Sequence, residues 1–184
     1  MTLVDSFPDK KLGMRYPNSR HTRIGDVMPH VEGMTTIVVL NDAYLDDERV
    51  HSIQELKRIT ELDSLAKVKT ESILTEGEKV LPNSLVKAIK ELSDDFKALN
   101  VERDDCGDKE YWKTDFSYLN GSLLEPFDDP VGAFTIVPEN ESWLIHTRDD
   151  EPWIYCLLTE QLARVLLDSE PDIAEKINSS FPYS

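Results

Sequence analysis

The fold is decided by residues 131 to 168, VGAFTIVPENESWLIHTRDDEPWIYCLLTEQLARVLLD. This stretch contains three short apolar runs, residues 133–137, 142–147 and 153–157, which are separated by polar residues and prolines. Short apolar runs divided by a few turn residues are typical of an antiparallel β-meander. The stretch therefore predicts three neighbouring strands of one sheet.

A helix is predicted directly after the third run. The side-chain oxygen of Thr159 can accept a hydrogen bond from the first helical turn and so cap it. Leu162, Val165 and Leu166 then recur at helical spacing, which places them on one face. We expect the helix 159–168 to pack against the meander through this face.

Residues 34–40, MTTIVVL, carry the strongest signal for a single strand. Consecutive β-branched residues indicate a strand that is buried on both faces. Such a strand belongs inside a sheet, and we expect it to lie beside the meander.

Between residues 43 and 100 the pattern is mostly helical. One helix is expected over 50–62 and a less regular one over 64–75. The clearest helix begins at Asn83 or Ser84 and is expected to run to the end of this region. Its apolar stripe consists of Leu85, Ile89, Leu92, Phe96 and Leu99.

Four other segments are expected to be less regular. Residues 1–30 are rich in proline and glycine and predict an extended N-terminal arm over the domain. Residues 101–130 form a long acidic connection, with a short strand expected within 112–119. Residues 171–178 predict a short closing helix that begins at a proline, and the final residues, FPYS, are expected to be loosely held.

These elements describe one α+β domain that spans residues 1–184. Its sheet is mostly antiparallel and contains the meander 133–157 and the strand 34–40. We expect the helices of residues 48–100 and 159–168 to cover one face of that sheet.

The formal net charge is −16, from 36 acidic and 20 basic residues, and most of the excess lies in residues 101–184. A negative field of this kind repels nucleic acid and anionic lipid and attracts basic proteins. We therefore expect a basic protein partner, with no binding to nucleic acid or membranes. No apolar run is long enough to span a membrane, and the first residues lack the apolar core of a secretory signal, so a cytoplasmic location is expected.

No motif predicts catalysis, a metal site or a cofactor. The four histidines lack metal-ligand spacing, and His146 is expected to be a surface or hydrogen-bonded residue. Cys106 and Cys156 carry no nucleophile signature and are expected to be reduced rather than joined in a disulfide. Glycine-rich phosphate loops are also missing from the sequence.

The candidate binding residues are turn acids in the second half of the chain. Acidic pairs and triplets flank the strands of the meander, and an acidic, aromatic-rich segment precedes it. Carboxylates of this kind set the rate and orientation of protein association, while aromatic residues supply the anchors. The alternative is that the acids form a solvated face without a binding role and that the aromatic residues lie in the core. The residues selected as partner-binding are Asp128, Asp129, Asp149, Asp150 and Glu151, with Trp112 as an anchor.

Residues 135–157, TIVPENESWLIHTRDDEPWIYCL, resemble the strand–turn–strand runs of immunity proteins from bacterial toxin systems. The resemblance covers about forty residues of pattern rather than an invariant motif. It implies a protein that binds a cognate toxin domain, often a basic nuclease, and occludes its active site. The inhibitor's acids would then take the place of nucleic-acid phosphates.

Two alternatives stay open. One is a structural or regulatory module that self-associates through the apolar stripe of the helix beginning at Asn83. The other is an enzyme that uses its acidic residues together with a divalent metal. The sequence does not indicate the oligomeric state.

Overall fold

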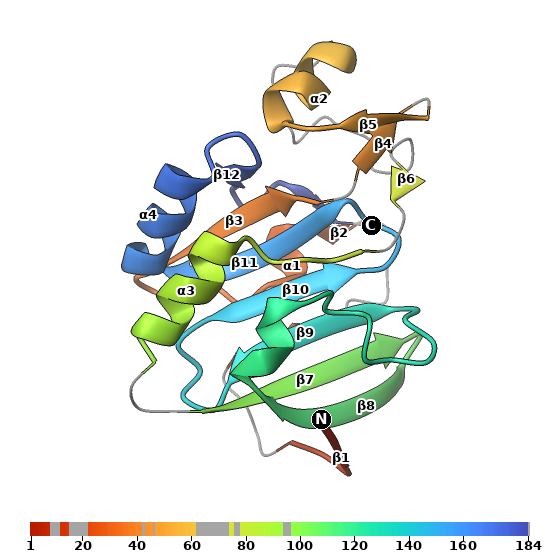
Figure 1. Ribbon diagram of the computed structural model, residues 1–184, viewed down its shortest axis with the longest axis vertical. Coiled ribbons are helices and arrows are strands. Elements are labelled where there is room, and N and C mark those ends of the chain that lie inside the picture. The colour runs from red at the N-terminus through yellow and green to blue at the C-terminus, as the bar shows by residue number, and fades with distance from the viewer. Residues whose placement is uncertain are drawn as a thin grey trace.

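The structure is a computed structural model that describes residues 1–7, 12–14, 22–41, 43–45, 47–61, 74–75, 78–93 and 97–183. An eight-stranded sheet forms its centre (Figure 1). In spatial order its strands are β1 (Thr2–Val4), β8 (Asp108–Asp115), β7 (Ala98–Asp105), β9 (Ala133–Pro138), β10 (Leu144–Arg148), β11 (Trp153–Thr159), β3 (Met34–Leu40) and β12 (Ala174–Lys176).

Every pairing in this sheet is antiparallel. The described helices are α1 (Ile24–Val27), α2 (Ile53–Ile59), α3 (Asn83–Glu91) and α4 (Glu160–Ser169), and a 3₁₀ helix, η3, covers Phe116–Asn120. The α+β class and the mostly antiparallel sheet predicted from the sequence are therefore confirmed.

The predicted meander is present as β9, β10 and β11. Ile145 of β10 lies opposite Ile136 of β9 and Cys156 of β11, which fixes the register. The predicted strand 34–40 is β3, and it pairs with β11 along its whole length, as Tyr155 opposite Val38 illustrates. All three strands of the meander are buried almost throughout because both faces of the sheet are covered.

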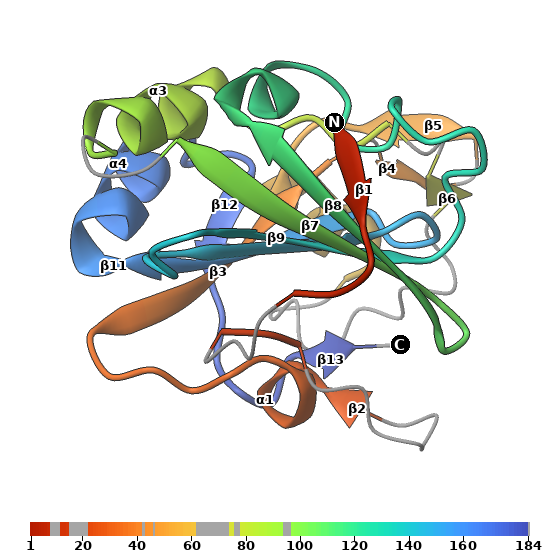
Figure 2. The same ribbon diagram turned by 90° about the horizontal axis from the view of Figure 1, so that it is seen from below.

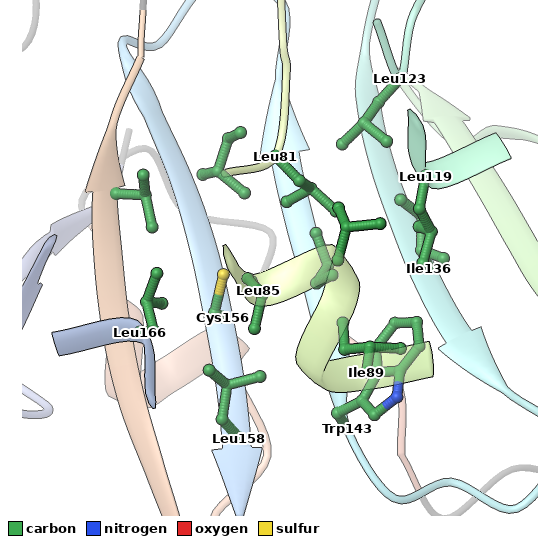
Figure 3. Packing of buried hydrophobic residues seen from close by; sticks show 14 of the residues in the cluster. Leu81, Leu85, Ile89, Leu119, Leu123, Ile136, Trp143, Cys156, Leu158 and Leu166 are labelled. Carbon is green, nitrogen blue, oxygen red and sulfur yellow. The ribbon is translucent and has the colours of Figure 1, made fainter. Parts of the chain in front are cut away.

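Helices α3 and α4 cover one face of the sheet (Figures 1 and 2). The α3 residues Leu85 and Ile89 lie over the central strands, close to Cys156 and Trp143 (Figure 3). Thr159 caps α4 as predicted, because its hydroxyl accepts a hydrogen bond from the Leu162 backbone at 3.5 Å. This helical layer forms the first of two hydrophobic cores.

Segments near both ends of the chain help to cover the opposite face (Figure 2). The second core contains Leu12, Met14 and residues of α1, packed against Trp153 and Tyr155 of β11. In the C-terminal tail, β13 (Pro182–Tyr183) pairs with β2 (Thr22–Arg23). The prediction of a loosely held tail is wrong for the described residues, because the tail pairs with β2 and packs against the sheet. The N-terminal arm also contributes β1, β2 and α1, elements that its sequence did not reveal.

The helix predicted to run to residue 100 ends at Glu91. The Ser93 hydroxyl donates a hydrogen bond to the Ile89 carbonyl, just beyond the last helical turn. Leu92 is largely exposed, and Leu99 lies in β7, where it reaches the first core. Apolar residues alternate after residue 97, as they do in a strand, and Leu99 fits both this alternation and the helical spacing. Phe96 lies outside the described residues.

The segment predicted as a long acidic connection is mostly a hairpin of β7 and β8. Its turn contains Cys106 and Gly107, both with positive φ. Charged side chains pair across the two strands, as the 2.9 Å contact between Lys109 Nζ and Glu102 Oε1 shows. Because charged residues occupy these strands, the apolar alternation that ordinarily indicates a strand is weak, and the sequence was interpreted as a loop.

Short strands replace two other predicted helical regions. β4 (Ala43–Leu45), β5 (Glu48–Val50) and β6 (Leu74–Thr75) form a small separate sheet. The remainder of the predicted helix 64–75 lies outside the described residues. Residues 174–176, expected in a closing helix, form the edge strand β12. Helix α2 is shorter than predicted, and it contributes to the second core rather than to the layer of α3 and α4.

The two cysteines are free thiols in very different surroundings. Cys106 is exposed in the β7–β8 turn, whereas Cys156 is buried in β11, where burial raises the pKa of its thiol to about 12. We expect a thiol reagent to modify Cys106 alone in the native protein and both cysteines after unfolding. Mass spectrometry of Cys106→Ser should show no native labelling; rapid labelling of that variant would contradict the burial of Cys156.

Candidate protein-binding surface

Four of the candidate acids meet at one end of the sheet. Asp128 and Asp129 lie in the loop from η3 to β9, and Asp149 and Asp150 lie in the turn from β10 to β11. The Asp149 backbone N–H donates to the Gly132 carbonyl at 3.2 Å, which joins this turn to the loop. Acids that are about twenty residues apart in sequence therefore share one surface.

Gly132 makes the close approach of this loop to β7 possible. Its φ is +107°, and a Cβ placed there would lie 2.5 Å from the Asp104 carbonyl oxygen. Any other residue would push the loop away from β7. The glycine thus fixes the position of Asp128 and Asp129 relative to the hairpin of β7 and β8.

The acids of the β9–β10 turn lie at the opposite end of the sheet. The backbone N–H of Glu139 donates to the Ala98 carbonyl at the start of β7, and its carboxylate lies 3.7 Å from Lys113 Nζ. Glu141 accepts a hydrogen bond from the backbone of Leu12. These acids belong to a different surface from Asp128 and Asp149.

An open groove of about 740 Å³ lies at the end that carries Asp149. Three separate segments line it: the stretch between β6 and α3, the loop between η3 and β9, and the β10–β11 turn. Its apolar lining includes Val80 and Val131, whose exposed fractions of 39% and 44% are among the highest of the large hydrophobic residues. The other apolar lining residues are Leu124, Phe127 and Pro130.

Three carboxylates line the same groove, those of Glu78, Glu125 and Asp149. None of them forms an ion pair or side-chain hydrogen bond with another residue in the described part of the chain. Neither lysine nor arginine occurs among the described lining residues. Lys79 follows Glu78 but points inward, where it is fully buried and donates to Thr75 Oγ1 at 2.9 Å.

The arginines nearest to this surface are already engaged within the protein. Arg103 donates from Nε to the Val131 carbonyl at 2.9 Å and from Nη1 to Glu110 at 3.1 Å. Arg148 forms a bidentate pair with Asp150, with two contacts of 3.0 Å. The groove therefore keeps an uncompensated negative charge while neighbouring acids are neutralised.

Trp112 does not stand out from the surface as an anchor. It lies in β8, is partly buried, and packs against the first core. Its ring meets Phe127 edge-on at 5.6 Å between ring centroids, and its indole nitrogen is buried. Because Phe127 lines the groove, Trp112 supports the groove from within the protein.

Glu151 is buried, although its sequence context suggested an exposed turn acid. Glu151 is only 1% exposed, and its Oε2 accepts a hydrogen bond from the Tyr155 hydroxyl at 2.7 Å. Burial, together with the Glu151 carboxylate, raises the pKa of Tyr155 well above its usual range, so this hydroxyl stays a donor. Glu151 therefore anchors the β10–β11 turn from inside rather than contributing to the surface.

His146 also lies inside the protein, on the face covered by the C-terminal tail. Its Nδ1 lies 3.0 Å from Thr135 Oγ1, and its Nε2 lies 2.9 Å from the Tyr183 hydroxyl. The sequence predicted a surface or hydrogen-bonded histidine. His146 is hydrogen-bonded, and it is fully buried rather than on the surface. Among the described residues, no group of three or more His, Cys, Asp or Glu side chains is placed to hold a metal ion.

Sequence reasoning missed Glu78 and Glu125 as parts of the surface. Each is a single acid in an irregular stretch, whereas the selected residues occur in pairs or triplets. The segment EPFDDP, residues 125–130, offered one local signal, since Glu125 precedes two prolines that frame an aromatic residue and two acids. Glu78 gave none, because only the folded chain brings it beside Asp149.

Comparisons with known protein families, with curated proteins and with solved structures found no match. None of the described helices is long and apolar enough to cross a membrane.

Proposed function

We propose that this protein is an acidic inhibitor of the immunity type, which binds and neutralises a basic toxin domain. The observation that carries the proposal is the open groove, whose lining combines apolar side chains with three carboxylates that have no ion-pair partner among the described residues. We define the acidic groove as Glu78, Val80, Glu125, Phe127, Val131 and Asp149. A basic protein segment complements both the charge and the apolar surface.

Unpaired carboxylates favour a cationic partner more than paired ones do. An acid that already has a partner must lose it before it can bind another cation, whereas Glu125 and Asp149 have no side-chain partner within the described ranges of the chain. Each exposed ion pair contributes about 0.2–1 kcal/mol, and this gain rises as the partner displaces water from an apolar groove. The net charge of −16 also accelerates the encounter with a basic protein.

The apolar lining supplies the remaining driving force. Val80 and Val131 leave much of their surface in contact with water. Burying such side chains contributes about 25 cal/mol for each Å² removed from water. The groove therefore combines apolar and charged side chains in one surface, and protein interfaces use both kinds of residue.

The alternative of self-association through the apolar stripe of α3 finds less support, because most of that stripe is not exposed in the folded protein. Leu85 and Ile89, which form the core of the predicted α3 stripe, are fully buried between α3 and the sheet. A stripe that is already used for folding is not available as an interface between copies.

Neutralising two groove carboxylates should weaken partner binding by about two- to thirtyfold, because two ion pairs are lost at once. The variant Glu125→Gln/Asp149→Asn is compared with Asp168→Asn/Asp172→Asn, which removes the same charge from exposed positions in and after α4. Both variants and the wild-type chain serve as baits in a lysate of the source organism, with washes of rising salt. We expect a basic protein to be retained by the wild-type and control baits and lost by the groove variant.

Retention of the same proteins by all three baits would contradict binding through the acidic groove. For a recovered partner, the association rate with the wild-type chain should fall as ionic strength rises. Inhibition is then tested by co-expressing the partner with the wild-type chain or the groove variant. Growth rescued equally by both would refute neutralisation through this surface.

A further inference from the structure

We infer that the acidic groove selects arginine side chains of its partner over lysine side chains. This inference rests on the proposed function and specifies the chemistry of the partner. It follows from three properties of the groove: its occupied backbone, its mixture of carboxylates with apolar surface, and the arginine contacts already present at its edge.

Several backbone groups at the groove are already hydrogen-bonded within the protein. The Asn41 side-chain amide bonds both the N–H and the carbonyl of Val80, at 3.4 and 2.9 Å. The Val131 carbonyl accepts from Arg103, and the Asp149 N–H donates to Gly132. These groups are unavailable to an added strand of the partner, so recognition falls to the side chains of the groove.

Arginine suits those side chains better than lysine does. A guanidinium group is planar and weakly hydrated, so it can bond a carboxylate through two donors while its faces contact aromatic or apolar groups. Pro130 and Val131 supply exposed apolar surface in the same groove as the carboxylates of Glu125 and Asp149, whereas Phe127 lines it as a buried residue. A lysine ammonium group is strongly hydrated and gains less from entering such a groove.

The protein already uses arginine in this way next to the groove. Arg148 forms its bidentate pair with Asp150 while its guanidinium carbon lies 5.6 Å from the centre of the Tyr183 ring. Arg103 bonds Glu110 while only 13% of its side chain is exposed. Partly buried guanidinium–carboxylate pairs are therefore compatible with this end of the sheet.

The test compares two fluorescent peptides of equal charge, octa-arginine and octa-lysine. Their affinities for the wild-type chain, the groove variant and the Asp168→Asn/Asp172→Asn control are measured by fluorescence anisotropy at physiological ionic strength. We expect octa-arginine to bind the wild-type chain and the control at least about fivefold more tightly than octa-lysine. Glu125→Gln/Asp149→Asn should abolish this preference.

Equal affinity of the wild-type chain for the two peptides would overturn the arginine inference. If both peptides still bound less well to the groove variant, the proposed interaction with basic proteins would stand. A preference for arginine that survived in the groove variant would show that the selection occurs elsewhere and would also overturn the inference. The capture experiment tests the proposed function separately, because it does not depend on which basic residue the partner carries.

Discussion

Replacing Phe181 with alanine is expected to lower the free energy of unfolding by about 3–5 kcal/mol, the usual cost of removing a buried phenylalanine. Phe181 is only 3% exposed, although it is the fourth residue from the C-terminal end. Its ring meets Trp153 edge-on at 5.9 Å and Tyr155 at 6.1 Å, both measured between centroids. The substitution leaves a cavity in the second core.

The tail also joins two parts of the chain that are remote in sequence. The Phe181 carbonyl accepts a hydrogen bond from the Ile24 backbone at 2.8 Å, and the following strand β13 pairs with β2. Loosening the tail therefore weakens the packing of α1 as well. This shared role places the expected loss toward the upper part of the range.

Urea denaturation followed by circular dichroism measures the effect. Leu92→Ala is the control, because it also shortens a hydrophobic side chain but at a position that is 47% exposed. Its expected effect is within about 0.5 kcal/mol. Equal stability of the two variants would show that the C-terminal tail does not complete the core.

Local patterns predicted the centre of this fold and failed at its margins. The meander and β3 were predictable because their apolar runs are bounded by turn residues and because buried strands need no polar face. The β7–β8 hairpin was missed because Lys109 and Arg103 pair across it with acids and so conceal its alternation. The tail was missed because Phe181 and Tyr183 are stabilised by contacts with β11 and β2, which no local window contains.

The same distinction explains the prediction of the binding surface. Asp149 and Asp150 lie in the turn that the flanking apolar runs predict, so their position was readable from the sequence. Glu151 follows them directly but turns inward, because the hydroxyl of Tyr155 lies within hydrogen-bond distance on β11. Glu78 and Glu125 reach the groove only through the packing of distant segments. Charge runs therefore pointed to this end of the sheet, whereas the fold determines which carboxylates line the groove.

Lowering the pH from about 7 to about 5 is expected to destabilise the protein by about 2 kcal/mol through His146 alone. Burial, and then the nearby Arg148 guanidinium, lowers the pKa of His146 from 6.5 to about 3. In this window the imidazole is neutral in the folded protein but takes up a proton in the unfolded chain. Because the unfolded state then binds more protons, stability falls as the pH falls.

The neutral imidazole fits its surroundings in a way that the charged form does not. It lies between the hydroxyls of Thr135 and Tyr183, and its ring lies 6.1 Å from that of Tyr155. The Arg148 guanidinium lies over the Tyr183 ring and acts against a second cation at His146. Protonation would place a charge on a fully buried ring, and burial disfavours the charged form.

His146→Gln isolates this contribution, because glutamine can still hydrogen-bond but does not titrate. We expect the variant to be less stable than the wild-type chain near neutral pH and to lose less stability on acidification. Urea midpoints are measured at half-unit steps across the window, which lies above the ordinary pKa of most carboxylates. His30 and His51 are exposed and unchanged in both proteins, so the difference between the two curves reports His146. Parallel curves would mean that His146 does not remain neutral when the protein folds, and the packing of the tail over β10 would need a different explanation.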